Sequence, residues 1–71
     1  MNINKLRGKI VEQGLNVEKV AFALGVDKAT LYRKMHANGE TLTIKEVNKL
    51  CEILNISKVE AMDIFFKDFV A

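Results

Sequence analysis

The residues best suited to chemistry lie between positions 28 and 36, in the segment KATLYRKMH. Its lysine and arginine side chains carry positive charge and several hydrogen-bond donors, and its threonine and tyrosine add hydroxyl groups. Such groups pair with phosphate oxygens and with acceptor atoms on base edges. The carboxylates of the chain are scattered and form no pairing typical of general acid–base catalysis. We therefore expect a binding protein and not an enzyme.

Metal and redox chemistry lack the residue types they need. Cys51 is the single cysteine and His36 the single histidine, so the sequence predicts neither a disulfide nor a metal site. Cys51 falls on the apolar stripe of a predicted helix, which favours packing over reactivity. We expect no cofactor. No apolar run reaches the roughly 18 residues of a membrane span, and the segment MNINKLRGK lacks a signal peptide's apolar part, so we expect a cytoplasmic protein.

Charge is distributed unevenly along the chain. Residues 1–39 carry seven Lys or Arg against three Asp or Glu, whereas residues 40–71 carry four against six. A basic half with a net charge of +4 and an acidic half with −2 indicate that one face meets a polyanion.

Helical periodicity runs through the whole chain, which we interpret as one all-α domain over residues 1–71. Five short helices with brief connections predict a compact orthogonal bundle. Side chains that can accept a backbone hydrogen bond precede each helix: Asn2, Asn16, Asp27, Thr43 and Ser57. Thr43 with Glu46, and Ser57 with Glu60, have capping-box spacing. The predicted helices are Ile3–Gln13, Val17–Leu24, Lys28–Ala37, Ile44–Leu54 and a last one from after Ser57 to about Val70.

The second and third helices have the spacing of a helix-turn-helix. Ala21 supplies the small residue where the two helices cross, and Gly25, four residues later, suits a left-handed turn. Val26 follows as an apolar plug. Leu31 and Met35 are the large aliphatic residues that anchor the third helix, and its remaining positions are left free.

The pattern A-x-x-x-G-V-x-x-x-T-L-Y-R-K-M resembles the Cro/CI (lambda-repressor-like, XRE) family, particularly its small phage-type members. The downstream T-I-K-E-V-N-K-L-C-E-I-L-N-I-S and I-F-F resemble that family's fourth and fifth helices. The resemblance implies a five-helix DNA-binding domain that reads the major groove with its third helix.

Two positions depart from the family's pattern. Val17 stands where the family commonly has a glutamine that touches DNA phosphate, and Lys34 stands where it often has a large apolar residue. We therefore expect other phosphate donors, namely Asn16, Lys19, Lys34 or backbone amides.

A helical wheel of about 100° per residue places Leu31 and Met35 on one side of the third helix and Arg33 roughly opposite. Arg33 and Lys28 are candidates for guanine, and Ala29 for a thymine methyl group. Tyr32 either touches DNA or covers the core edge, and His36 is more typical of a surface residue near a helix end than of a phosphate contact. An exposed basic face can also be merely solvated. The predicted base-contacting residues are Lys28, Ala29, Thr30, Tyr32 and Arg33.

The fifth helix is apolar over about half its circumference, more than one core contact needs. We expect Val59, Met62 and Phe66 to close the core. The other apolar residues would meet a partner, most simply a second copy, although every aromatic side chain could instead pack inside the monomer. The predicted interface residues are Phe65, Phe69 and Val70.

Two hypotheses of function follow. The first is a sequence-specific transcriptional regulator of phage or prophage type, Cro- or repressor-like, that binds double-stranded DNA as a homodimer. The second is an interaction module on the same fold, an anti-repressor or modulator that binds another repressor through its apolar last helix.

Overall fold

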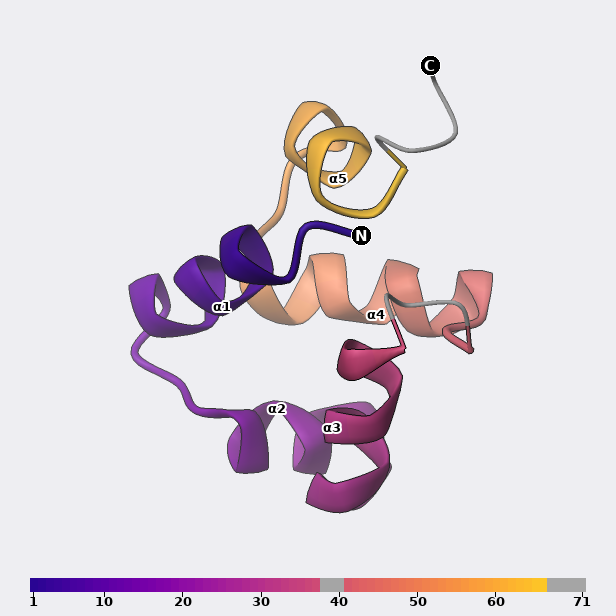
Figure 1. Ribbon diagram of the computed structural model, residues 1–71. Coiled ribbons are helices and arrows are strands. Elements are labelled where there is room, and N and C mark those ends of the chain that lie inside the picture. The colour runs from indigo at the N-terminus through magenta and orange to yellow at the C-terminus, as the bar shows by residue number, and fades with distance from the viewer. Residues whose placement is uncertain (38–40, 67–71) are drawn as a thin grey trace.

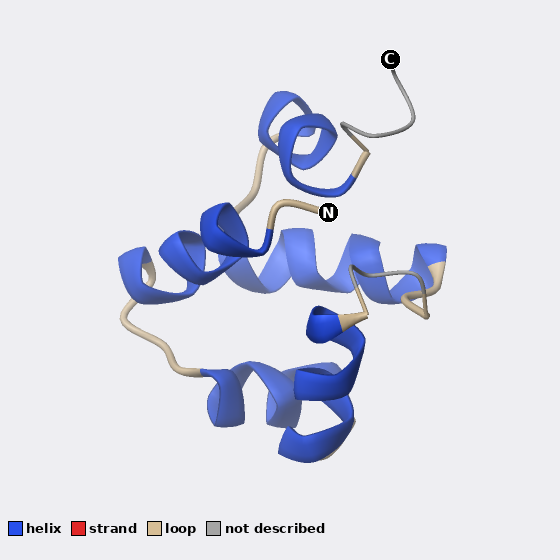
Figure 2. Cartoon of the chain, in the orientation of Figure 1, coloured by secondary structure: helices blue, strands red, loops and turns tan. Residues whose placement is uncertain are grey.

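Five helices form the fold in a computed structural model that describes residues 1–37 and 41–66. They are α1 (Ile3–Glu12), α2 (Val17–Leu24), α3 (Lys28–His36), α4 (Ile44–Leu54) and α5 (Lys58–Phe65). The described residues contain no strand (Figure 2). Within these same residues, no helix has the length and apolar character needed to cross a membrane.

Every helix begins at the predicted capping residue. The side chains of Asn2, Asn16, Asp27, Thr43 and Ser57 each accept a hydrogen bond from the backbone amide three residues later. Both predicted capping boxes form: the Glu46 carboxylate accepts from the Thr43 amide at 3.0 Å, and that of Glu60 from the Ser57 amide at 3.1 Å. These local bonds satisfy amides that have no partner inside the helix, and they fix where each helix starts.

Helix ends follow the predictions less closely. The bounds of α2 and α4 are as predicted, whereas α1 and α3 each end one residue early, at Glu12 and His36. The predicted extension of α5 to Val70 is wrong as far as the structure describes it, because α5 ends at Phe65 with Phe66 as its C-cap. Residues 67–71 lie outside the described residues.

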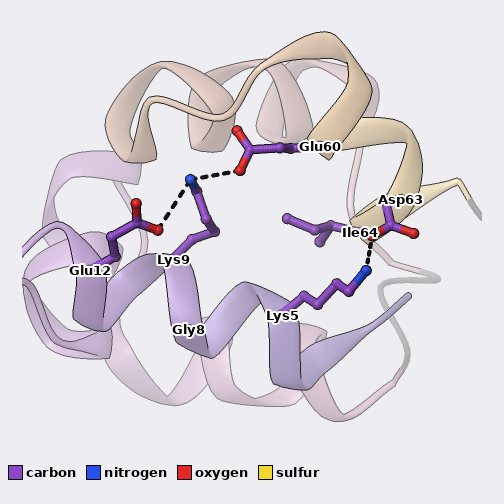
Figure 3. Close-up of a pocket in the computed structure, with 7 residues that line it drawn as sticks. All are labelled: Lys5, Gly8, Lys9, Glu12, Glu60, Asp63 and Ile64. Atoms are coloured by element: carbon purple, nitrogen blue, oxygen red, sulfur yellow. Dashed lines mark hydrogen bonds and ion pairs between the residues drawn. The ribbon is translucent and has the colours of Figure 1, made fainter.

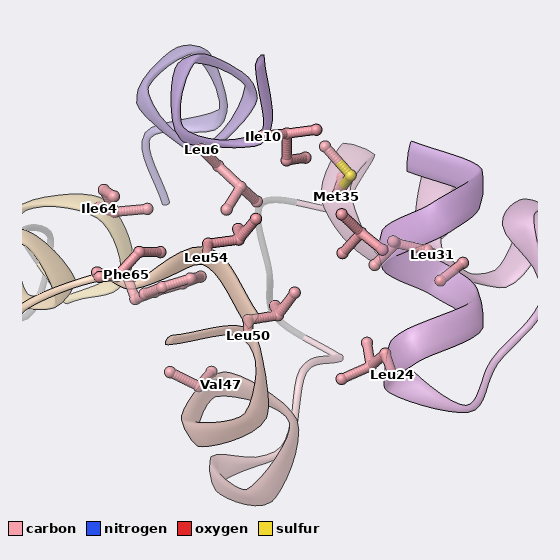
Figure 4. Packing of buried hydrophobic residues seen from close by; sticks show 13 residues of the cluster. Leu6, Ile10, Leu24, Leu31, Met35, Val47, Leu50, Leu54, Ile64 and Phe65 are labelled. Atoms are coloured by element: carbon pink, nitrogen blue, oxygen red, sulfur yellow. The ribbon is translucent and has the colours of Figure 1, made fainter. Parts of the chain in front are cut away.

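The core lies where the five helices meet. Figure 1 shows α4 running across the middle of the molecule, with α1 and α5 on one side of it and α2 and α3 on the other. Helix α2 packs against both α3 and α4, and α1 packs against α5. Figure 4 shows the buried side chains that fill the space between them, among them Leu6, Ile10, Leu31, Met35, Leu50 and Leu54.

Helix α5 is oriented differently from the prediction, although Phe66 packs against the core as expected. Ile64 and Phe65 are buried, with 2% and 7% of their surface exposed, whereas Val59 is 81% and Met62 48% exposed. Phe65 points into the core in Figure 4, so the expectation that it meets a partner is wrong, as is a core role for Val59. Phe69 and Val70 lie outside the described residues.

The orientation of α5 has a physical reason in its contacts with the start of the chain. The backbone amide of Asn2 donates to the carbonyl of Ile64 at 2.7 Å. The ammonium of Lys9 lies 2.8 Å from Glu60 Oε2, and Lys5 pairs with Asp63 (Figure 3). The hydrogen bond with Lys9 lowers the pKa of Glu60 below its usual value. These bonds hold the Glu60–Ile64 side of α5 against α1 and leave Val59 outside.

Cys51 packs against the core as expected, although it is half-buried and not fully enclosed. Burial raises the pKa of its thiol. A raised pKa keeps the sulfur protonated and weakly nucleophilic, in agreement with a packing role.

Candidate nucleic-acid interface

The connection between α2 and α3 is a tight turn built on Gly25. Gly25 is in the left-handed region with φ of 86°, and its amide donates to the carbonyls of Ala21 and Phe22. The amide of Val26 donates back to the carbonyl of Ala21 at 3.0 Å, which closes the end of α2. Ala21 is buried and Val26 packs against the core, so each residue of the turn occupies the role that the spacing predicted.

Helix α3 is anchored on one side and open on the other. Leu31 and Met35 are each 1% exposed. Lys28, Ala29 and Arg33 are exposed on the remaining surface, with Thr30 and Tyr32 half-buried at its edges. The structure thus brings the five predicted base-contacting positions onto the surface of one helix, directly after the turn.

Arg33 is held by its own helix. Its Nη2 donates to Thr30 Oγ1 at 3.2 Å, and the amide of Thr30 donates to Asp27 Oδ1 at 2.7 Å. The bond from the Thr30 amide is the main reason that the pKa of Asp27 is lowered, and the positive charge of Arg33 adds to it. The chain Asp27–Thr30–Arg33 restricts the guanidinium before any ligand arrives.

A second row of side chains, Lys28, Tyr32 and His36, lies along the edge of α3 opposite Thr30. The Lys28 ammonium lies 5.9 Å from the centre of the Tyr32 ring, and the Tyr32 and His36 rings are stacked at 6.0 Å with planes 12° apart. The spacing i, i+4, i+8 lines these three residues up along the helix. His36 is exposed, as expected for a surface residue, and its contact with Tyr32 was not anticipated.

A family model described as a Cro/C1-type HTH DNA-binding domain matches residues 5–65. The chain belongs to this family. No curated protein and no solved structure matched the chain significantly. Family membership makes the helix-turn-helix of α2 and α3 a DNA-binding element and gives no indication of an enzyme.

Where this member of the Cro/C1-type family departs from the usual pattern at Val17, other donors stand nearby. Val17 packs against the core. Asn16 and Lys19 are exposed at the start of α2, and Asn16 Oδ1 caps the helix by accepting from the Lys19 amide at 2.8 Å. Within the described residues, the Lys19 ammonium and the Asn16 amide nitrogen make no hydrogen bond or ion pair. Both remain available to a phosphate.

Lys34 has a partner inside the protein that the sequence did not predict. Its ammonium lies 2.9 Å from each carboxylate oxygen of Glu46, and its side chain is 20% exposed. The phosphate contact expected of Lys34 stays a prediction, and the structure adds that a carboxylate of α4 already pairs with this lysine. From its sequence position, Glu46 was expected only to cap a helix. The departure of Lys34 from the family's apolar preference was the one signal that it has a partner.

Proposed function

We propose that the protein is a sequence-specific transcriptional regulator, Cro- or repressor-like and of phage or prophage type, which acts in the cytoplasm by occupying an operator. The observation that carries this proposal is the open face of α3, where Lys28, Ala29 and Arg33 lie away from the Leu31–Met35 anchor. Arg33 and Lys28 would bind guanine O6 and N7, and Ala29 would pack on a thymine methyl group. Thr30 and Tyr32 would complete the contacts.

Phosphate contacts would set the register of this helix in the groove. Asn16 and Lys19 at the start of α2 are the donors best placed for that role, since nothing described in the structure neutralises Lys19. Each phosphate neutralised by a lysine should add about 0.9 to the slope of log affinity against log salt.

Selection of binding sites from random duplex DNA, at one stated salt concentration, tests the proposal. The parent should enrich a defined sequence, and Arg33→Ala should lose about 1–3 kcal/mol of binding at that sequence and relax specificity there. The thermal melt of the variant should match the parent because Arg33 is exposed. Failure of the parent to enrich any sequence, or equal affinity of the variant for the enriched site, would contradict the proposed function.

We also propose that the regulator is a homodimer joined through the exposed side of α5. Val59 and Met62 are exposed there, and Met62 lines a groove with Cys51 and Phe66 between α4 and α5. Phe69 and Val70, the other two residues predicted to meet a partner, lie outside the described residues. A two-fold dimer would set two α3 helices one DNA turn apart, roughly 34 Å, on a palindromic site.

The same exposed side of α5 supports a second candidate function, a modulator that binds another repressor. Sedimentation over a wide concentration range separates the two. Self-association that Met62→Glu weakens would support the homodimer. A monomer at every concentration, with weak DNA affinity and a stable complex with a repressor, would favour the modulator.

A further inference from the structure

The Lys34–Glu46 pair joins the proposed reading helix to the next helix of the bundle. Lys34 lies in the last turn of α3, and Glu46 lies in the first turn of α4. Their side chains are 20% and 18% exposed, so water screens this pair less than it screens an exposed pair. The hydrogen bond from Lys34 is the largest cause of the lowered pKa of Glu46.

The ammonium of Lys34 is surrounded by acceptors inside the protein. A lysine ammonium has three donors. Three acceptors surround this one: Glu46 Oε1 and Oε2, both at 2.9 Å, and the carbonyl of Thr41 at 3.4 Å. A phosphate would have to compete with the Glu46 carboxylate for this ammonium.

The Glu46 carboxylate is itself fixed. Its Oε1 also accepts from the amide of Thr43 at 3.0 Å, and the Glu46 amide donates to Thr43 Oγ1 at 3.1 Å. Lys34 therefore holds a group that the capping box of α4 keeps in place. Leu31 and Met35 anchor α3 through apolar contacts, which do not depend on direction. The Lys34–Glu46 hydrogen bonds, by contrast, have a defined direction.

We propose that Lys34 is a positioning residue, which sets the angle of α3 through Glu46 and makes no contact with DNA. The inference rests on the proposed function and names how its reading helix is aligned. A change in that angle would misplace Arg33 and Lys28 on the base edges, while phosphate binding at the start of α2 would persist. Loss of the pair should therefore reduce specific binding more than non-specific binding.

The test is a double-mutant cycle of Lys34→Gln and Glu46→Gln, measured on a selected site and on unrelated duplex DNA over a range of salt concentrations. Glutamine at position 46 can still accept from the Thr43 amide, because capping boxes use Glu or Gln there. The double variant has the net charge of the parent. Lys49→Gln with Glu52→Gln, two exposed residues of α4, is the charge-matched control, and Lys19→Gln reports the loss of a phosphate contact.

We expect both single variants to weaken specific binding by about 2- to 30-fold, the range typical of residues that act on a ligand without touching it. The double variant should bind the selected site no more weakly than the weaker-binding single variant does. All three variants should keep the parent's slope of log affinity against log salt and its non-specific affinity. The Lys49–Glu52 control should bind as the parent does. Measurement well below each melting temperature separates these effects from a loss of folded protein.

Two results would overturn the inference. The first is a slope of log affinity against log salt that is smaller by about 0.9 in Lys34→Gln, together with unchanged or stronger binding by Glu46→Gln. This result would make Lys34 a phosphate contact. Unchanged specific affinity in all three variants would limit the pair to stability. If the parent protein binds its selected site and either of these results is found, only the inference about Lys34 is rejected. If the parent protein selects no sequence, the proposed function is rejected as well.

Discussion

At the scale of single residues, the proposed interface consists of side chains that already contact one another within the chain. Arg33 donates to Thr30, and Lys28 lies over the Tyr32 ring, which is stacked on His36. A restrained side chain loses less conformational freedom on binding than a free one does, so these contacts favour affinity without touching the ligand.

Thr30→Val tests this restraint because valine has nearly the same shape and lacks the hydroxyl acceptor. The Asp27 cap uses the backbone amide of residue 30 and should survive. We expect specific affinity to fall by about 0.5–1.5 kcal/mol, the net worth of one hydrogen bond. Titrations of the selected duplex measure the effect.

Combination with Arg33→Ala provides the control for Thr30. If the hydroxyl acts through the guanidinium, the double variant should bind no more weakly than Arg33→Ala alone. Additive losses would instead mean that Thr30 acts only through the DNA contact proposed for it and not through Arg33.

At the scale of the elements, the turn at Gly25 sets how α3 leaves α2. A β-branched residue is a genuine outlier at positive φ, whereas asparagine tolerates it. We expect Gly25→Val to lower the melting temperature and the DNA affinity together, and Gly25→Asn to lower both much less. A Gly25→Val protein with the parent's melt and affinity would show that the left-handed φ of 86° is not required.

One substitution on the buried face of α5 and one on its exposed face test which face packs inward. Phe65 is 7% exposed and Met62, three residues earlier, is 48% exposed. Phe65→Ala should cost about 3–5 kcal/mol of unfolding free energy, and Met62→Ala at most about 1 kcal/mol. Urea denaturation followed by circular dichroism measures both. Equal losses, or a larger loss at Met62, would mean that α5 packs with its other face inward.

The elements also show how far the sequence could predict this fold. Capping residues, the turn at Gly25 and the anchors of α3 were predicted correctly, because each depends on neighbours within a few residues. The inward face of α5 was not, because apolar residues lie on several sides of it and the deciding contacts come from α1. The partner of Lys34 was missed for the same reason, since Glu46 belongs to another helix.

At the scale of the whole molecule, ion pairs link helices that are distant in sequence. The pKa of Glu60 is lowered chiefly by Lys9 and that of Glu46 chiefly by Lys34, while the bond from the Thr30 amide lowers that of Asp27. Each carboxyl therefore stays charged to lower pH in the folded chain than in the unfolded chain.

Stability against acid follows from these three shifts. Their contribution is complete above the ordinary pKa of each carboxyl and is lost as the pH falls through the lowered value in the folded protein. We expect the free energy of unfolding to decrease below about pH 5. Urea titrations at several pH values measure it, and Glu60→Gln should make the decrease shallower. A free energy that stays constant from neutral pH to strong acid would contradict these ion pairs.

The bond between the Asn2 amide and the Ile64 carbonyl has a consequence for synthesis of the chain. The contacts between α2 and α3 are close in sequence and can form early, before α4 packs against α2. Of the five described helices α1 is synthesised first, yet Lys5, Lys9 and the Asn2 amide find these partners in α5, the last of the five. During translation α1 therefore stays without these partners until α5 has been made, and Ile64 supplies the acceptor for the Asn2 amide.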